Sequence, residues 1–158
     1  MTPTIRRAPA DTSDPSLPLA ETSRHLAALA GRSASEIDCA YLFGSAARGE
    51  RGPLSDLDVA LLFADSTPGP RRLDLAAAVA EEAERLTKTA VDIVILNDAP
   101  PALRHRVIRD GVLLFAHDER RRVAFESRSI AEFLDFQPAL AQYDRQLLER
   151  AREGRLGT

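Results

Sequence analysis

Apolar residues along the chain fall into runs whose spacing predicts alternating helices and strands. Residues 37–43, 56–63 and 90–96 are nearly continuous apolar runs of strand length, as expected for strands covered on both faces. Elsewhere apolar residues recur at helical spacing, and glycine or proline marks the ends of the segments. The remaining predicted elements are helices over 19–31, 73–86 and 100–111, a short strand over 112–115, and a helix from 118 onward with a break at Pro138.

This order of elements predicts an α/β or α+β fold, with a small mixed sheet flanked by helices and a helical C-terminal tail. At 158 residues the chain is long enough to bury the core of one domain. Residues 1–17 are rich in Pro, Thr, Ser and Asp, so we expect a disordered N-terminal arm. Residues 18–117 would form the domain, and 118–158 a helical extension that packs on the domain or on a partner.

Composition narrows the function mainly by exclusion. The net charge of −3 and the absence of tryptophan argue against direct binding of nucleic acid. No apolar run approaches the length of a membrane span, and no signal peptide is evident, so we expect no membrane association. The single cysteine, Cys39, lies in an apolar run and is interpreted as a buried side chain. These features favour a cytoplasmic protein.

Two carboxylates stand at the start of the second apolar run. Asp56 and Asp58 are two residues apart, so on a strand they project from the same face. Burying two carboxylates is costly unless cations or hydrogen bonds compensate them. A divalent cation such as Mg²⁺, which is typically held by one or two carboxylates and by substrate phosphates, would do so. Asp92 lies within the third run, and if the two strands are neighbours it would join the pair and suit two metal ions.

The turn before these acids has the residues of a phosphate site. Gly44 lets the backbone approach a ligand closely, and Ser45 offers a hydroxyl and an N–H. Arg48 can contact phosphate or Asp56, or can equally be the structural partner of a nearby acid. Ser55 precedes Asp56 and would orient its carboxylate. No glycine-lysine-serine/threonine element follows, so this is not a P-loop.

The segment GSAARGERGPLSDLDV, residues 44–59, together with the later Asp92, resembles the nucleotidyltransferase superfamily of the DNA polymerase β type. In its fuller form it is similar to the minimal nucleotidyltransferase (MNT) antitoxins, which pair with HEPN-domain ribonuclease toxins. The resemblance implies a polymerase β-like fold in which residues 18–117 are the nucleotidyltransferase domain.

The same resemblance implies roles for individual residues. Gly44 and Ser45 would hold the phosphates of ATP, while Asp56 and Asp58 would bind two Mg²⁺ ions. Asp92 would complete the metal site and help deprotonate the acceptor. The implied reaction passes AMP to a tyrosine hydroxyl of the toxin in a hetero-complex and releases pyrophosphate.

Other interpretations of the sequence remain open. The chain could neutralise its partner by binding alone, or could modify a small molecule of the aminoglycoside type, although 158 residues leave little room for a further substrate domain. A sugar-nucleotide transferase would leave the Gly-Ser turn unexplained. Outside the motif, Arg120, Arg121 and Arg122 are interpreted as a solvated helix face, with contact to an acidic partner as the alternative.

Overall fold

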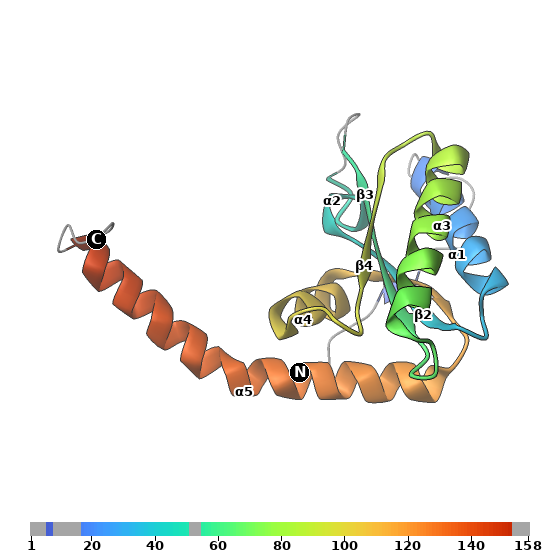
Figure 1. Cartoon of the computed structure of the whole chain (residues 1–158). Coiled ribbons are helices and arrows are strands. Elements are labelled where there is room, and N and C mark those ends of the chain that lie inside the picture. Colours follow the sequence, from blue (N-terminus) through green and yellow to red (C-terminus); the bar gives the residue numbers. More distant parts are fainter. Residues whose placement is uncertain (1–5, 8–16, 51–54, 153–158) are drawn as a thin grey trace.

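The computed structural model describes residues 6–7, 17–50 and 55–152, and in that part of the chain five strands form one mixed sheet in the order β1-β5-β2-β3-β4. Helices cover both faces of this sheet (Figure 1). The elements are β1 (Arg6–Arg7), α1 (Leu17–Arg32), β2 (Ile37–Phe43), α2 (Gly44–Ala47), β3 (Leu57–Phe63), α3 (Gly69–Thr87), β4 (Val91–Ile95), α4 (Pro101–Asp110), β5 (Val112–Ala116) and α5 (Glu119–Arg152).

The central strand β2 is buried along its whole length, which explains its continuous apolar run. It pairs antiparallel with β3 on one side and with β5 on the other. β3 and β4 are parallel neighbours, and α3 provides the crossover between them. This parallel pairing puts the first residues of β3 and β4 at the same end of the sheet, which positions the site described below.

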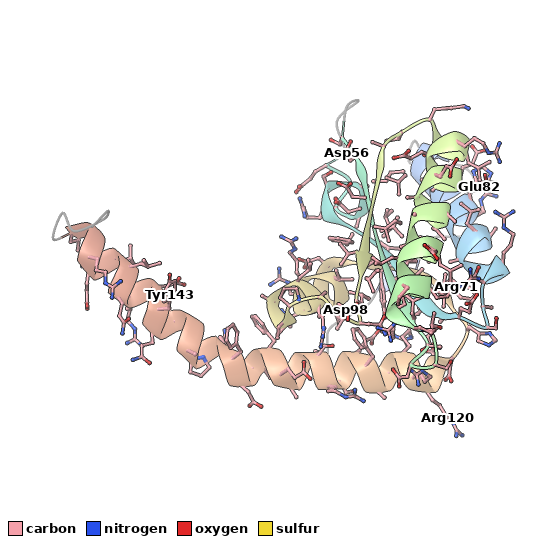
Figure 2. All side chains as sticks on the ribbon, in the orientation of Figure 1. Asp56, Arg71, Glu82, Asp98, Arg120 and Tyr143 are labelled. Carbon is pink, nitrogen blue, oxygen red and sulfur yellow. The ribbon has the colours of Figure 1, made fainter. Side chains whose placement is uncertain are left out.

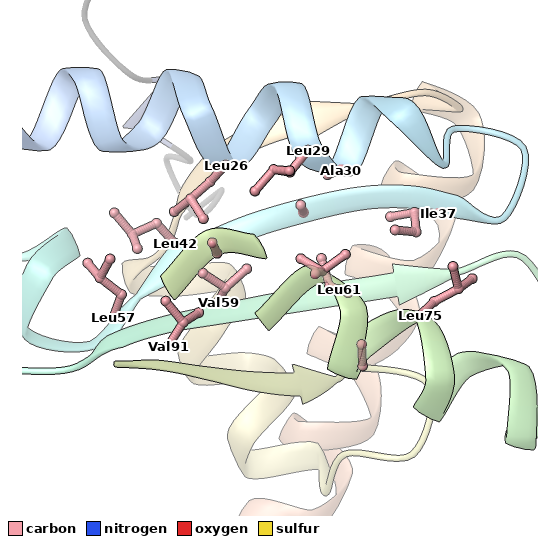
Figure 3. Close-up of a cluster of buried hydrophobic side chains, with 14 of the residues drawn as sticks. Leu26, Leu29, Ala30, Ile37, Leu42, Leu57, Val59, Leu61, Leu75 and Val91 are labelled. Carbon is pink, nitrogen blue, oxygen red and sulfur yellow. The ribbon is translucent and has the colours of Figure 1, made fainter. Parts of the chain in front are cut away.

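α1 and α3 cover one face of the sheet, where the larger hydrophobic cluster forms (Figure 3). Leu26 and Leu29 of α1 and Leu75 of α3 pack onto strand residues such as Leu61, which has no exposed surface. Apolar side chains at helical spacing thus meet side chains at the alternating spacing of the strands. Burial of these side chains is the main source of stability for the domain.

The opposite face of the sheet carries α4 and the first half of α5, and a buried polar network ties α5 to β2. The Tyr41 hydroxyl of β2 donates a hydrogen bond of 2.6 Å to Glu126. Arg122 in turn donates to Glu126 over 2.5 Å, and both side chains are buried. The interpretation of the three arginines as a solvated face is therefore wrong for Arg122, and Arg121 is half-buried and bonded to Asp38. Only Arg120 points into solvent (Figure 2).

The break that the sequence predicted at Pro138 does not occur in the long helix α5. The helix runs without interruption from Glu119 to Arg152, with Pro138 inside it. It changes direction partway along, and its second half projects away from the domain (Figure 1). A proline in a helix removes one hydrogen bond and favours a kink, and a solvated helix can tolerate both. Large apolar side chains stay exposed on this half, among them Phe136, Tyr143 and Leu148.

The other elements predicted from sequence are confirmed, with ends that differ by a few residues. Of the predicted N-terminal arm, Arg6 and Arg7 pair with Val112 and Leu113 of β5, and Leu17 starts α1. The remainder of the arm lies outside the described residues, as do residues 153–158 of the C-terminal extension. Cys39 is buried as expected. No helix in the described part of the chain has the length and apolar character needed to cross a membrane.

Candidate active site

The parallel pairing of β3 and β4 places two predicted site residues side by side. Asp58 and Asp92 are direct partners in the register of the two strands, so their side chains leave the same face of the sheet. Asp56 lies just before β3, on exposed chain at the end of the sheet remote from α5 (Figure 2). The condition stated for Asp92, that its strand lies beside the strand of Asp58, is therefore met. The strand itself starts at Leu57, one residue after Asp56.

The electrostatics of Asp58 reflect this crowding of carboxylates. Partial burial raises the pKa of Asp58 above its ordinary value, and the nearby charges of Asp92 and then Asp56 raise it further. Arg106 and Arg48 act in the opposite direction and offset part of this effect. Negative charge is therefore concentrated at this point, and a cation placed there would be stabilised.

Gly44 is shaped to fit against Asp58. Its φ is +71°, a left-handed conformation that glycine adopts without strain. A Cβ atom built on Gly44 would stand only 2.1 Å from Oδ2 of Asp58, which is far inside van der Waals contact. Both the backbone angle and the lack of a side chain are therefore needed to seat the Asp58 carboxylate beside the turn.

The other residues predicted at the phosphate turn lie close by, but their contacts differ from one another. Ser45 is half-buried in the short helix α2, and its carbonyl accepts a hydrogen bond from the Glu50 N–H. Arg48 is exposed and pairs with Glu50 over 2.8 Å. This contact corresponds to one of the two roles considered for Arg48, the partner of a nearby acid, and its contact with phosphate stays a prediction. Ser55 is half-buried directly before Asp56.

Arg106 is a residue of this site that the sequence pattern did not single out. It lies on α4 and is exposed. Of the positively charged residues near Asp58, it lowers the pKa of that carboxyl most. Its neighbour Val107 is completely buried, so α4 presents its apolar side to the sheet while Arg106 stays in solvent near the acids. Sequence periodicity marks Arg106 as a solvent-facing residue, but only the docking of α4 shows which site it faces.

The donors at this site fit a hard divalent cation. They are carboxylate oxygens, the ligands that Mg²⁺ and related ions prefer, and the repulsion that raises the pKa of Asp58 would be relieved by a cation. Within the described residues, no three His, Cys, Asp or Glu side chains are gathered into a ready-made metal site. Asp58 and Asp92 therefore supply a preformed pair, and Asp56 stands two residues away on exposed chain.

Comparison with solved structures shows that other proteins share this fold. A chain from a toxin–antitoxin complex with AMP-PNP is 23% identical, with a TM-score of 0.65 over 79% of this chain and 98% of that one. A chain from the tri-AMPylated Shewanella oneidensis HEPN toxin in complex with MNT antitoxin is 21% identical, with a TM-score of 0.64 over 82% and 98%. A chain from the MntA–HepT toxin–antitoxin complex is 21% identical, with a TM-score of 0.62 over 81% and 97%. At these identities the likeness establishes a shared fold.

Sequence comparison gives the family itself. No curated protein matches the chain. The family model described as polymerase beta, nucleotidyltransferase, matches residues 28–120, which include the Gly-Ser turn and all three acids. This match spans more than half of the chain and coincides with the sheet and helices that form the site. The chain therefore belongs to the polymerase beta nucleotidyltransferase family.

Proposed function

We propose that this protein is the antitoxin of a toxin–antitoxin pair and transfers AMP from ATP to a tyrosine hydroxyl of a HEPN-type ribonuclease toxin. The observation that carries the proposal is Gly44, held at positive φ against Asp58, with Asp92 in register beside it. That arrangement serves a phosphate-bearing substrate next to paired carboxylates. The similar folds include one from a complex with AMP-PNP and one from a complex with a tri-AMPylated toxin, which favours this reaction over other nucleotidyl transfers.

The acids would hold Mg²⁺, two ions in the arrangement we propose, with Asp58 and Asp92 as the preformed ligands and Asp56 as the third. Bound Mg²⁺ supplies charge neutralisation for the triphosphate and for the departing pyrophosphate. Gly44 and Ser45 would contact the phosphates through the backbone and the hydroxyl. Arg48, freed from its exposed contact with Glu50, is available to the same phosphates, because exposed ion pairs contribute little stability.

The proposed transfer is a single displacement at the α-phosphorus of ATP. The tyrosine oxygen attacks the α-phosphorus of ATP in line, the bond from that phosphorus to the bridging oxygen breaks, and pyrophosphate leaves. The tyrosine proton must be removed, because its pKa is about 10. Asp92 is the proposed acceptor of that proton, since it is exposed near the start of β4 and can face the incoming tyrosine. AMP ends as a phosphodiester on the tyrosine.

The second half of α5 supports the idea of a protein acceptor. It projects from the domain and keeps Phe136, Tyr143 and Leu148 exposed, although side chains of this size are normally buried. A partner that covers them would be held beside the domain that carries the acids. We propose that the predicted extension, residues 118–158, packs on the domain with its first half and meets the toxin with its second.

The test uses the purified chain, ATP labelled at the α-phosphate, Mg²⁺, and the HEPN-domain protein encoded beside it. Transfer should add the mass of one or more AMP groups to a tyrosine of that protein, and Asp56→Asn and Asp58→Asn should each abolish the transfer. Glu50→Gln, which changes an exposed acid of the same loop, is the matched control and should retain activity. If both aspartate variants transferred AMP at the rate of the parent protein, the proposal would be wrong. Neutralisation of the toxin by the double variant without ATP would instead indicate inhibition by binding.

A further inference from the structure

A cavity of about 340 Å³ lies at the end of the sheet remote from the three acids. Leu62 near the end of β3 and Asn97 just beyond β4 line it from the sheet, and α4 and α5 line it from the other side. Asp58 and Leu62 are four strand residues apart, which corresponds to roughly 13 Å along β3. The cavity is therefore a separate feature from the candidate active site.

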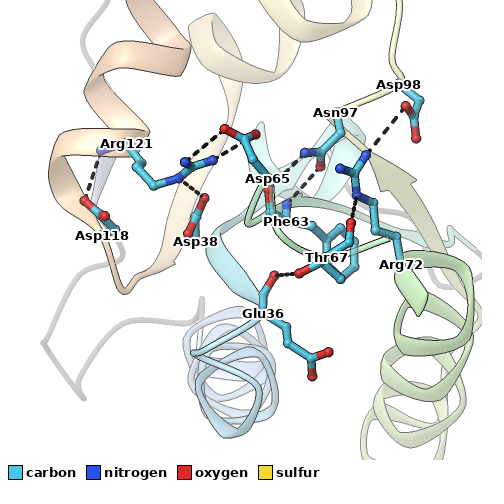
Figure 4. A network of polar contacts seen from close by, with 10 residues as sticks. All are labelled: Glu36, Asp38, Phe63, Asp65, Thr67, Arg72, Asn97, Asp98, Asp118 and Arg121. Atoms are coloured by element: carbon cyan, nitrogen blue, oxygen red, sulfur yellow. Dashed lines mark hydrogen bonds and ion pairs between the residues drawn. The ribbon is translucent and has the colours of Figure 1, made fainter. Parts of the chain in front are cut away.

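Arginines dominate the polar lining of this cavity. Arg72, Arg104, Arg121 and Arg128 all contribute to it, from α3, α4 and α5. Arg121 donates hydrogen bonds to Asp38 behind it and to Asp65 (Figure 4). Arg128 forms no hydrogen bond or ion pair within the described part of the chain. The positive charge of Arg128 acts on Asp65. The pKa of Asp65 is lowered most by its hydrogen bond with Arg121 and more weakly by the charges of Arg128 and Arg72.

The carboxylates that balance these arginines stand mostly in solvent. The Asp65 side chain is 82% exposed, and Asp98, which lies 3.8 Å from Arg72, is 71% exposed. Ion pairs with carboxylates so exposed are weak and exchange readily with other anions. Glu132, 41% exposed, accepts a hydrogen bond of 3.0 Å from Arg104. The cavity thus offers guanidinium groups that a stronger anion could bind.

Two buried polar atoms of residues in this lining have no hydrogen-bond partner among the described residues. They are Nε of Arg104 and Oγ of Ser129, and Ser129 is only 1% exposed. The other nitrogens of Arg104 are engaged, with Glu132 and with the carbonyl of Asn97. Buried donors without partners are uncommon in folded proteins because the desolvation they suffer is not recovered. Nε of Arg104 can only donate and the Ser129 hydroxyl can donate or accept, so an acceptor would satisfy both atoms.

We propose that this cavity binds a small phosphomonoester, whose phosphoryl group is held by Arg104, Arg128 and the Ser129 hydroxyl. Guanidinium groups match phosphate oxygens in charge and in planar, paired geometry, and a hydroxyl adds a further donor. The volume exceeds what a lone phosphate needs, and Phe125 supplies an aromatic wall for an organic body. The proposal does not depend on the reaction at the acid site, because it uses none of the same residues.

The test is isothermal titration calorimetry of the full chain with two probes, inorganic phosphate and AMP, in EDTA and at fixed ionic strength. Removing divalent cations keeps the phosphates away from the acid site, where carboxylates would repel them. We expect one saturable site, with the dissociation constant raised about tenfold by Ser129→Ala and by Arg128→Gln, since each removes a hydrogen bond to a charged group. Tighter binding of AMP than of phosphate would identify an organic body on Phe125, and equal binding would identify the phosphoryl group alone.

Matched variants make this experiment decisive. Arg120→Gln removes an arginine from the same helix that points away from the cavity, and it should leave both affinities unchanged (Figure 2). Ser129→Ala should keep or raise the melting temperature of the free protein, because it removes an unpaired buried hydroxyl. The proposal is overturned if neither probe binds, if Arg120→Gln weakens binding as much as Arg128→Gln, or if Ser129→Ala lowers the melting temperature.

Discussion

Replacing Gly44 by alanine is the sharpest single perturbation of the candidate active site. The added methyl group would stand 2.1 Å from Oδ2 of Asp58, so either the carboxylate or the turn must move. Asp58 cannot shift far, because its neighbours Leu57 and Val59 are fixed in the core of β3. We therefore expect the carboxylate to be displaced by about 1 Å or more, and transfer of AMP to fall about a hundredfold.

Gly49 provides the matched control for this experiment. Its φ is +72°, almost the same as that of Gly44, but no atom of the described residues lies within 4 Å of the position its Cβ would take. Alanine at either position adopts the left-handed region at a cost of about 1–2 kcal/mol. Both variants should lose that much stability, and Gly44→Ala somewhat more because of the added contact. Only Gly44→Ala should lose most of its activity.

The assay compares the two variants by chemical denaturation and by initial rates of AMP transfer at saturating MgATP. A large loss of rate in Gly44→Ala, with Gly49→Ala close to the parent protein, supports the packing of Gly44 against Asp58. If both variants lose activity equally, mobility of the turn rather than that contact controls the rate. Retention of full activity by Gly44→Ala would refute the reasoning outright.

Three further predictions concern stability. Asp58→Asn should raise the melting temperature in EDTA at neutral pH, since the raised pKa of Asp58 means that its charge is unfavourable in the folded state. The gain should decline once the pH falls below that raised pKa, where the native carboxyl takes up a proton, and should vanish below the ordinary pKa of aspartate in the unfolded chain. Glu126→Gln should lower the free energy of unfolding by about 1.5–3 kcal/mol, because Arg122 loses the charge of its buried partner while it keeps its pair with the exposed Glu119. Leu61→Ala should cost about 2–5 kcal/mol by denaturant titration, whereas Leu148→Ala, on the projecting half of α5, should cost almost nothing.

Most of the fold was predictable because burial imposes regular patterns. β2 and β3 are covered on both faces, so their sequences are almost continuously apolar and their boundaries could be located within a residue or two. The side-by-side placement of Asp58 and Asp92 depended on whether β3 and β4 are neighbours, which the sequence left open and the strand pairing settles. Gly44 could be selected from its place in the motif. That a side chain on Gly44 would collide with Asp58 follows only from the pairing of Phe43 with Asp58.

What the sequence could not predict depends on tertiary packing. Arg122 looks like its neighbours in sequence, and only the docking of α5 on β2 buries it against Glu126 and Tyr41. Proline is an unfavourable residue in a helix, yet α5 continues through Pro138. The influence of Arg106 on Asp58 also arises from packing, because α4 lies against the sheet and brings Arg106 near the acids. For Arg122 and Arg106 the docking of a helix decides the outcome, whereas Pro138 lies on the exposed half of α5, where no packing opposes a bend in the helix.

The continuity of α5 has a consequence for how a partner could be presented. Fourteen residues follow Pro138 within the helix, and at 1.5 Å per residue they extend roughly 20 Å from the domain. A continuous helix of this length fixes both how far a bound partner lies from the domain and how that partner is rotated about the helix axis. Inserting four residues after Pro138 would lengthen it by about one turn and nearly preserve its phase, whereas inserting two would rotate its far end by roughly half a turn. The pair of insertions would therefore separate reach from orientation in the delivery of an acceptor.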